Sequence, residues 1–206
     1  MTEQLIKTFI IFFVVVEPVS LVPMFGALTR GYEPSERKRL AIKAVAISAG
    51  IFIVFALLGD WLLQLLGISV SAFKIAGGLL LFLLAVDMVL ARESGLRSTT
   101  VREQEEARYR EDISVFPLAF PLITGPGTLA TLLLLTAETT DLLGFSMVLG
   151  VGLLILLVTL VFLLLSQPLM RVIGVTGGMV ISRLLGVVLA ALAVQYVISG
   201  VSEVLL

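Results

Sequence analysis

The sequence predicts an all-α integral membrane protein with six transmembrane helices in two inverted three-helix repeats, the first helix of each repeat being broken near mid-bilayer. Three observations lead to this prediction. The 206 residues are 59% hydrophobic and only 14% charged, with a mean hydropathy of +1.14. The apolar residues form long segments, and Lys and Arg cluster in alternate connections between them. Two of the apolar segments carry proline-rich interruptions at matching positions.

The composition excludes several functional classes. An average soluble domain is about 25% charged, and a soluble chain of this length could not bury so much apolar surface. A nucleic-acid-binding or disordered protein is excluded on the same ground. The sequence has no Cys and no His, which removes thiol nucleophiles, Cys/His zinc sites and Ser-His-Asp triads. We therefore expect neither an enzyme nor a bound metal or cofactor, beyond coupling to Na+ or H+.

Six apolar segments are long enough to cross a hydrocarbon core of about 30 Å. Those of the second half carry no charge, whereas those of the first half contain a few charged residues, mostly near their ends. Lys74 and Arg183 lie near span ends, where we expect them to snorkel, and the pair Gly77-Gly78 is expected to allow close helix approach. The predicted spans are residues 5–28, 40–59, 69–91, 113–137, 142–170 and 184–202.

The whole chain, 1–206, is read as one membrane domain in two halves, 1–91 and 113–206. The polar stretch 92–112 between them carries mixed charges, and its opposite charges lie three or four residues apart. It is interpreted as a solvated cytoplasmic linker; a regulatory docking site is the alternative.

The loops predict the orientation. Every Lys and Arg except Lys7 and Lys74 lies in the loop after the first, third or fifth span, or at an adjoining helix end. The other two connections, at residues 60–61 and 138–141, contain neither. The positive-inside rule then places both termini outside the cytoplasm, in a multi-pass protein of the cell inner (plasma) membrane. The expected partners are a small-molecule substrate and the lipid bilayer but no nucleic acid, and assembly as a homo-oligomer is left open.

A shift of 108 positions aligns the two halves. Pro18 then falls on Pro126, and the run 84–87 (LAVD) falls on 192–195 (LAVQ). Each half contains three spans, an odd number, so the second half must enter the bilayer upside down relative to the first. Inverted repeats of this kind are typical of secondary transporters, whose substrate sites lie at the repeat interface near the midplane.

The first helix of each half contains a proline-rich break. The first reads EPVSLVP over residues 17–23, and the second reads PLAFPLITGPGT over residues 117–128. Proline removes a helical hydrogen bond, and broken helices in a membrane line cavities or lie buried in protein. Amides freed by a break can bind a carboxylate, and freed carbonyls can bind an ammonium group. Hydroxyls can bind either group, so the breaks together match a zwitterion. Proline kinks that serve only helix packing are the alternative.

The predicted substrate-binding residues are those at the two breaks, with two further polar residues as lining. Glu17 lies near the middle of its span, where an ionised carboxylate is costly. It is interpreted either as a proton-coupling group or ligand for a substrate ammonium or Na+, or as a structural cap for the amides freed beside it. Gly125 occupies the matching position of the second half. The binding residues are Glu17, Pro18, Ser20, Thr124, Gly125, Pro126, Gly127 and Thr128, with Asp87 and Gln195 as polar lining.

With these motifs in view, the sequence resembles the MarC family, the SnatA-type neutral amino acid transporters. The resemblance covers essentially the whole chain and rests on Glu17-Pro18 to Pro23, followed by Phe25, and on the run 117–128. Many members carry Asp or Asn followed by Pro-Ile-Gly-Asn where this chain has Glu17-Pro18-Val19-Ser20.

The resemblance implies a six-helix inner-membrane protein related to the LysE-type exporter superfamily. It also implies transport of small neutral amino acids such as alanine, glycine or serine. No Walker motif is present, so we expect ion- or proton-coupled secondary transport by alternating access. The alternative is a channel, or an exporter for another small metabolite. An intramembrane enzyme is disfavoured because no second acidic residue accompanies Glu17 near the midplane.

Overall fold

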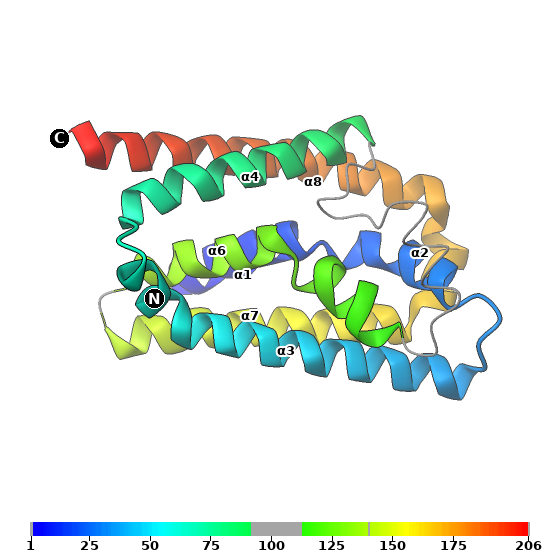
Figure 1. Ribbon diagram of the computed structural model, residues 1–206. Helices are drawn as coiled ribbons and strands as arrows, with labels where there is room; N and C mark the ends of the chain where they lie inside the picture. Colours follow the sequence, from blue (N-terminus) through cyan, green and yellow to red (C-terminus); the bar gives the residue numbers. More distant parts are fainter. Residues whose placement is uncertain (1, 92–112, 140, 206) are drawn as a thin grey trace.

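The computed structural model describes residues 2–91, 113–139 and 141–205, so the expected linker at 92–112 lies outside the described residues. Helices and short turns make up the whole of these three ranges. The helices are α1 (Thr2–Val16), α2 (Pro18–Leu28), α3 (Pro34–Leu65), α4 (Val70–Leu90), η1 (Ser114–Ile123), α6 (Pro126–Ala137), α7 (Leu142–Leu164) and α8 (Ser166–Leu205) (Figure 1).

Within the described ranges, the length and apolarity of the helices agree with five or six crossings, against the six predicted. Five helical stretches are suited to cross a membrane, and α1 with α2 forms one of them, Thr2–Leu28. The pair η1 and α6, bent by 52°, makes the sixth. The protein is therefore a multi-pass integral membrane protein, and both broken helices occur where the prolines predicted them.

Two helices differ in extent from the predicted spans, and local chemistry explains both. α3 begins at Pro34 rather than near residue 40, because Glu33 and Glu36 form a capping box and proline favours the first helical position. α7 ends at Leu164 rather than at residue 170, because the ring of Pro168 would collide with the carbonyl four residues earlier. A new helix, α8, starts at Ser166 and bends at Gly174, where φ is +63°.

The two ends of the molecule differ in charge, as the loops predicted. Both termini lie at one end, together with the α3–α4 and α6–α7 connections (Figure 1). The α2–α3 loop, the C-terminal end of α4 and the α7–α8 junction lie at the other end. The basic residues Arg30, Arg37 and Arg171 belong to this second end. The alternating path is therefore present, while its orientation relative to the cytoplasm remains a prediction.

The broken helices occupy the middle of the bundle. They lie between the pair α4 and α8 on one side and the pair α3 and α7 on the other (Figure 1). In the most apolar window of each span, 61% of the residues of α1–α2 are buried, against 28% of those of α8. The outward faces of α4 and α8 expose large apolar side chains such as Leu79 and Val187, as expected of helices that face lipid.

Candidate functional site

Glu17 separates α1 from α2 in a left-handed backbone conformation. Its φ and ψ are 50° and 62°, a region that a residue with a side chain rarely adopts and that costs roughly 1–2 kcal/mol. The next residue, Pro18, has no N–H to donate to the carbonyl of Val14, so α1 cannot continue through it. α2 then restarts with Pro18 as its first residue.

The Glu17 carboxylate is buried at this break. The residue is 1% exposed, and its Oε1 accepts a hydrogen bond of 2.5 Å from the Ser20 hydroxyl. The side chain makes no capping hydrogen bond to α2, so the interpretation of Glu17 as a side-chain cap was wrong. A carboxylate this deep in an apolar bundle is stable only when protonated or paired with a polar or cationic group.

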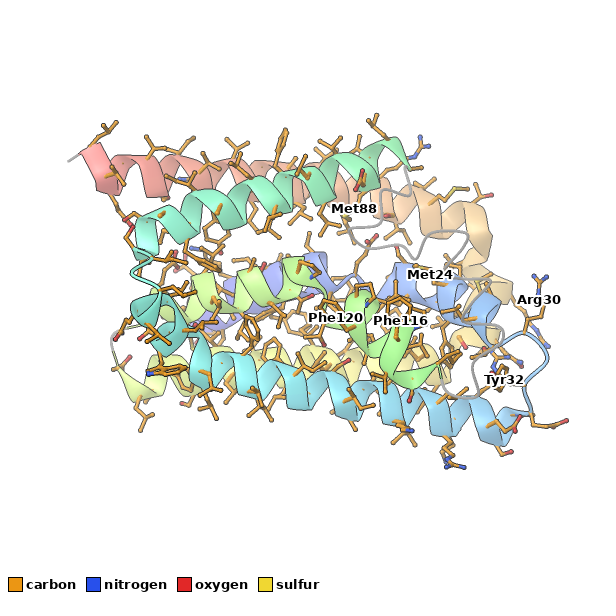
Figure 2. All side chains as sticks on the ribbon, in the orientation of Figure 1. Met24, Arg30, Tyr32, Met88, Phe116 and Phe120 are labelled. Atoms are coloured by element: carbon orange, nitrogen blue, oxygen red, sulfur yellow. The ribbon has the colours of Figure 1, made fainter. Side chains whose placement is uncertain are left out.

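The second break spans two irregular turns. Phe116 and Phe120 have extended backbone angles within η1, and each precedes a proline, which disfavours the helical conformation of the preceding residue (Figure 2). Both Phe-Pro peptide bonds are cis. Gly125 is the N-cap of α6, and a Cβ there would overlap the carbonyl oxygen of Pro121. The break therefore requires glycine at this position.

The hydroxyls around the second break bond to backbone carbonyls. Thr124 Oγ1 donates to the carbonyl of Ser48 at 3.4 Å, and Thr128 Oγ1 donates to the carbonyl of Ile123 at 3.2 Å. Ser48 Oγ in turn donates to the carbonyl of Ala119 at 3.4 Å. Two of these bonds are accepted by carbonyls of the break itself, those of Ala119 and Ile123, and the third ties the break to α3.

Ser48 is a site residue that sequence reasoning missed. It lies in the middle of α3 with its side chain fully buried against the second break. The signal was present in the sequence, because Ala41, Ala44 and Ser48 are small residues at helical spacing, and small residues mark a face where membrane helices approach closely. Thr131 was missed as well: its buried Oγ1 has no hydrogen-bond partner among the residues described.

The structure brings the two breaks together. A Cβ on Gly127 would lie 3.8 Å from Cγ1 of Val15, two residues before Glu17. A cavity of about 10 Å³, roughly the space of one water molecule, lies beside this contact, and Glu17, Pro18 and Ser20 are not among its lining residues. Predicted residues Gly125, Gly127 and Thr128 line it, together with apolar side chains from α1, α4 and η1. The space at the second break is therefore too small for an amino acid.

The two residues predicted as polar lining lie elsewhere. Asp87, in α4, is half-buried, and Gln195, in α8, is exposed. Neither lines the cavity at the break. The described part of the chain also contains no group of three or more His, Cys, Asp or Glu residues that could hold a metal ion.

Lys74 does not snorkel as expected. It is buried, and its Nζ lies 2.5 Å from Oε1 of Glu203 near the C-terminal end of α8. Ser71 donates a hydrogen bond of 3.0 Å to the other carboxylate oxygen. The ion pair forms because α4 and α8 lie side by side, which brings the start of one helix against the end of the other.

The family model described as "MarC family integral membrane protein" matches residues 2–205 of the chain. The chain belongs to the MarC family. It is similar to the UPF0056 membrane protein MJ1677 of Methanocaldococcus jannaschii, with 36% identity covering 99% of this chain and 98% of that protein. It is also 36% identical to the UPF0056 membrane protein YvbG of Bacillus subtilis, over 97% of this chain and 95% of the relative. A UPF0056 membrane protein of Archaeoglobus fulgidus is 32% identical, over 95% of this chain and 91% of the relative. No solved structure matches this MarC-family chain.

Proposed function

We propose that this chain is a secondary transporter that carries small neutral amino acids of the alanine, glycine and serine class across the inner membrane. Substrate binds where the two inverted repeats meet, and alternating access follows from exchange of their conformations. The observation that carries the proposal is the meeting of two helix breaks at equivalent positions of the two halves. The N-caps Glu17 and Gly125 stand 108 residues apart, and each is followed by a proline that starts the next half-helix.

The pairing of the helices supports the inverted repeats. α2 packs on α8, and its counterpart α6 packs on α4; α1 packs on α7, and η1 packs on α3. Two further pairs, α3 with α7 and α4 with α8, join each helix to its own counterpart. This reciprocity is what a two-fold relation between the halves produces, and a three-span unit repeated in one chain has to be inverted.

The chemistry of the breaks favours a zwitterion. α2 and α6 both begin inside the bundle, and their first amides present partial positive charge suited to a substrate carboxylate. The buried Glu17 carboxylate and the carbonyls freed by the breaks suit an ammonium group. The resemblance to SnatA-type transporters in the LysE-like exporter superfamily supports the same substrate class.

The small cavity at the second break supports a carrier rather than an open channel. Space for about one water molecule cannot admit an amino acid, so the helices at the break must part before substrate enters. Glu17 couples transport to H+ or Na+ by changing its protonation or its cation as the site opens.

Transport by purified protein in liposomes tests this proposal. We expect saturable uptake of labelled alanine or serine, with counterflow, that responds to an imposed proton or Na+ gradient and is lost in Glu17→Gln. Glu3→Gln is the matched control, since it makes the same chemical change at an exposed residue of the same span. Uptake that is absent, or present but indifferent to both gradients and to Glu17→Gln, would refute the carrier, and flux that rises linearly with substrate would identify a channel.

A further inference from the structure

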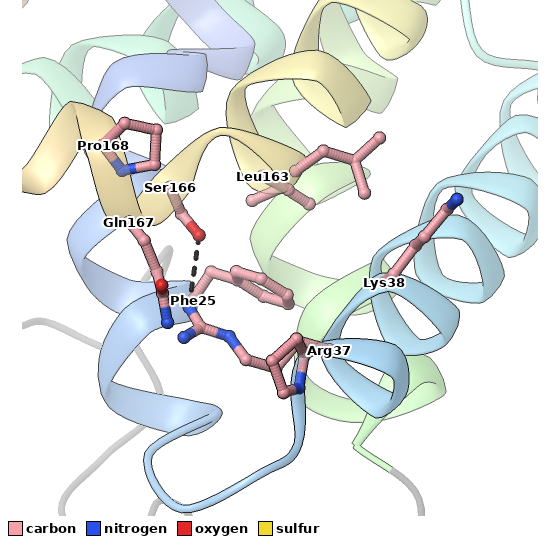
Figure 3. Close-up of a pocket in the computed structure, with 9 residues that line it drawn as sticks. Phe25, Arg37, Lys38, Leu163, Ser166, Gln167 and Pro168 are labelled. Carbon is pink, nitrogen blue, oxygen red and sulfur yellow. Dashed lines mark hydrogen bonds between the residues drawn. The ribbon is translucent and has the colours of Figure 1, made fainter.

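Two large cavities of the described structure lie at the basic end of the bundle. These adjoining cavities of about 420 and 440 Å³ lie between the end of α2, the start of α3 and the α7–α8 junction. They share the side chains of Arg37, Ser166 and Gln167 as a common wall (Figure 3). Each is far larger than the cavity of about 10 Å³ at the break.

Arg37 is held in place within this wall. Its Nη2 donates a hydrogen bond of 3.2 Å to Oγ of Ser166, a residue only 2% exposed (Figure 3). Its guanidinium carbon also lies 5.7 Å from the centre of the Phe25 ring, within the range of a cation–π contact. A guanidinium fixed by two contacts loses little conformational entropy when a ligand binds to its remaining N–H groups.

One of the two cavities is strongly cationic. Arg30, Arg37 and Arg171 line it together, and none of the described residues that line it carries a carboxylate. The ion pair between Lys74 and Glu203 is the one recorded within the described ranges, so none of these three arginines is neutralised by a carboxylate there. Three guanidinium groups that share one cavity and have no carboxylate partner among the described residues favour an anionic ligand with several acceptor oxygens. Their planar forks match a phosphate or carboxylate in a bidentate manner.

The adjoining cavity is mostly apolar. Phe25, Leu163 and Leu164 line it, and Leu164 is 41% exposed on the outer surface of α7. An apolar cavity that reaches the lipid-facing surface and shares a wall with a cationic cavity fits an amphiphile whose charged group sits at its end. Basic pockets between membrane helices on the cytoplasmic side are sites where anionic headgroups bind.

We propose that the joined cavities bind the headgroup of an anionic phospholipid. Its phosphate lies among Arg30, Arg37 and Arg171, and its glycerol and first methylenes lie against Phe25, Leu163 and Leu164. The bound lipid ties α2 and α3 to the α7–α8 junction. The proposal does not depend on amino acid transport, since none of the residues assigned to the lipid is among the predicted substrate-binding residues.

Native mass spectrometry of the full chain in detergent tests the site. Phosphatidylglycerol is titrated against zwitterionic phosphatidylcholine of the same acyl chains, and inorganic phosphate is titrated in parallel. The test variant is Arg30→Gln with Arg171→Gln, which leaves the Arg37–Ser166 bond in place. Its control is Arg39→Gln with Arg183→Gln, two exposed arginines that line neither cavity, so both double variants lose the same charge.

We expect phosphatidylglycerol to bind more tightly than phosphatidylcholine. The test variant should bind phosphatidylglycerol roughly 10- to 30-fold more weakly than the natural sequence does, because each arginine near the membrane surface contributes about one factor of five to the affinity. The control is expected to bind as the natural sequence does. Equal affinity for the two lipids, an equal loss in both double variants, or inorganic phosphate competing at concentrations comparable to the lipid would overturn the proposal. Unchanged melting temperatures of both variants, measured alongside, show that each is folded.

Discussion

Gly78 of α4 and Gly186 of α8 take equivalent places in one reciprocal helix contact. A Cβ on Gly78 would lie 2.8 Å from the carbonyl oxygen of Ala193, and a Cβ on Gly186 would lie 3.2 Å from the carbonyl oxygen of Ala85. Both pairs, Gly78 with Gly186 and Ala85 with Ala193, are separated by the same shift of 108 residues that relates the two breaks. The contact is therefore what the proposed two-fold relation between the halves requires.

The first prediction concerns these two glycines. We expect Gly78→Ala and Gly186→Ala each to destabilise the protein by about 1–3 kcal/mol, because the added methyl meets backbone that cannot move aside without separating α4 from α8. Thermal unfolding in detergent measures the change.

Gly50→Ala and Gly150→Ala are matched controls for that measurement. Both lie inside helices, and nothing stands within 4 Å of an added Cβ. Alanine there is expected to leave the melting temperature unchanged or raised, since glycine weakens a helix interior. A fall in the controls as large as that in the α4 and α8 variants would contradict the close contact.

The second prediction concerns the ion pair between α4 and α8. Glu203→Gln leaves the buried Lys74 ammonium without its carboxylate. We expect the free energy of unfolding to fall by roughly 1–3 kcal/mol. This is more than a surface pair contributes, because Lys74 is 8% exposed. Lys74→Met combined with Glu203→Gln is expected to recover most of that loss. A double-mutant cycle that yields no coupling would exclude the pair as a stabilising contact.

The third prediction concerns the hydroxyls that bracket the second break. Ser48→Ala and Thr124→Val each remove a buried donor to a backbone carbonyl, with an expected cost of about 0.5–2 kcal/mol each. Their effects should combine non-additively, since the two residues share one contact between α3 and η1. Ser146→Ala is the control, because that hydroxyl is exposed and bonds within its own helix. Equal effects at all three positions would mean that the break does not depend on these bonds.

The fourth prediction concerns Gly125. A methyl at this position overlaps the carbonyl oxygen of Pro121, so Gly125→Ala must displace the start of α6. We expect the unfolding free energy to fall by about 1–3 kcal/mol, with a lower melting temperature. We also expect loss of transport in liposomes. Gly26 lies in α2, and nothing stands within 4 Å of a Cβ added there. Gly26→Ala should therefore keep both the melting temperature and the transport activity. Full activity of Gly125→Ala would show that the geometry of the second break is dispensable.

The sequence determined the features that depend on local chemistry. About 20 apolar residues are needed for each crossing, so the apolar segments predicted the number of crossings. Proline cannot continue a helix, so the prolines predicted the two breaks. Basic residues mark one side of a membrane, so the loops predicted one basic end. Pro168 carried further local information, because its position ends α7 at Leu164, whereas the predicted span ran on to residue 170.

The tertiary structure alone decided which faces meet. Lipid is as apolar as leucine, so hydrophobicity does not indicate which side of a membrane helix packs against protein; small residues, shape and occasional polar bonds decide instead. For this reason the Lys74–Glu203 pair and the exposure of Gln195 emerged only from the packing. The same holds for the small cavity at the second break and for the arginines gathered around Ser166, because residues far apart in the chain form each site only when the helices assemble.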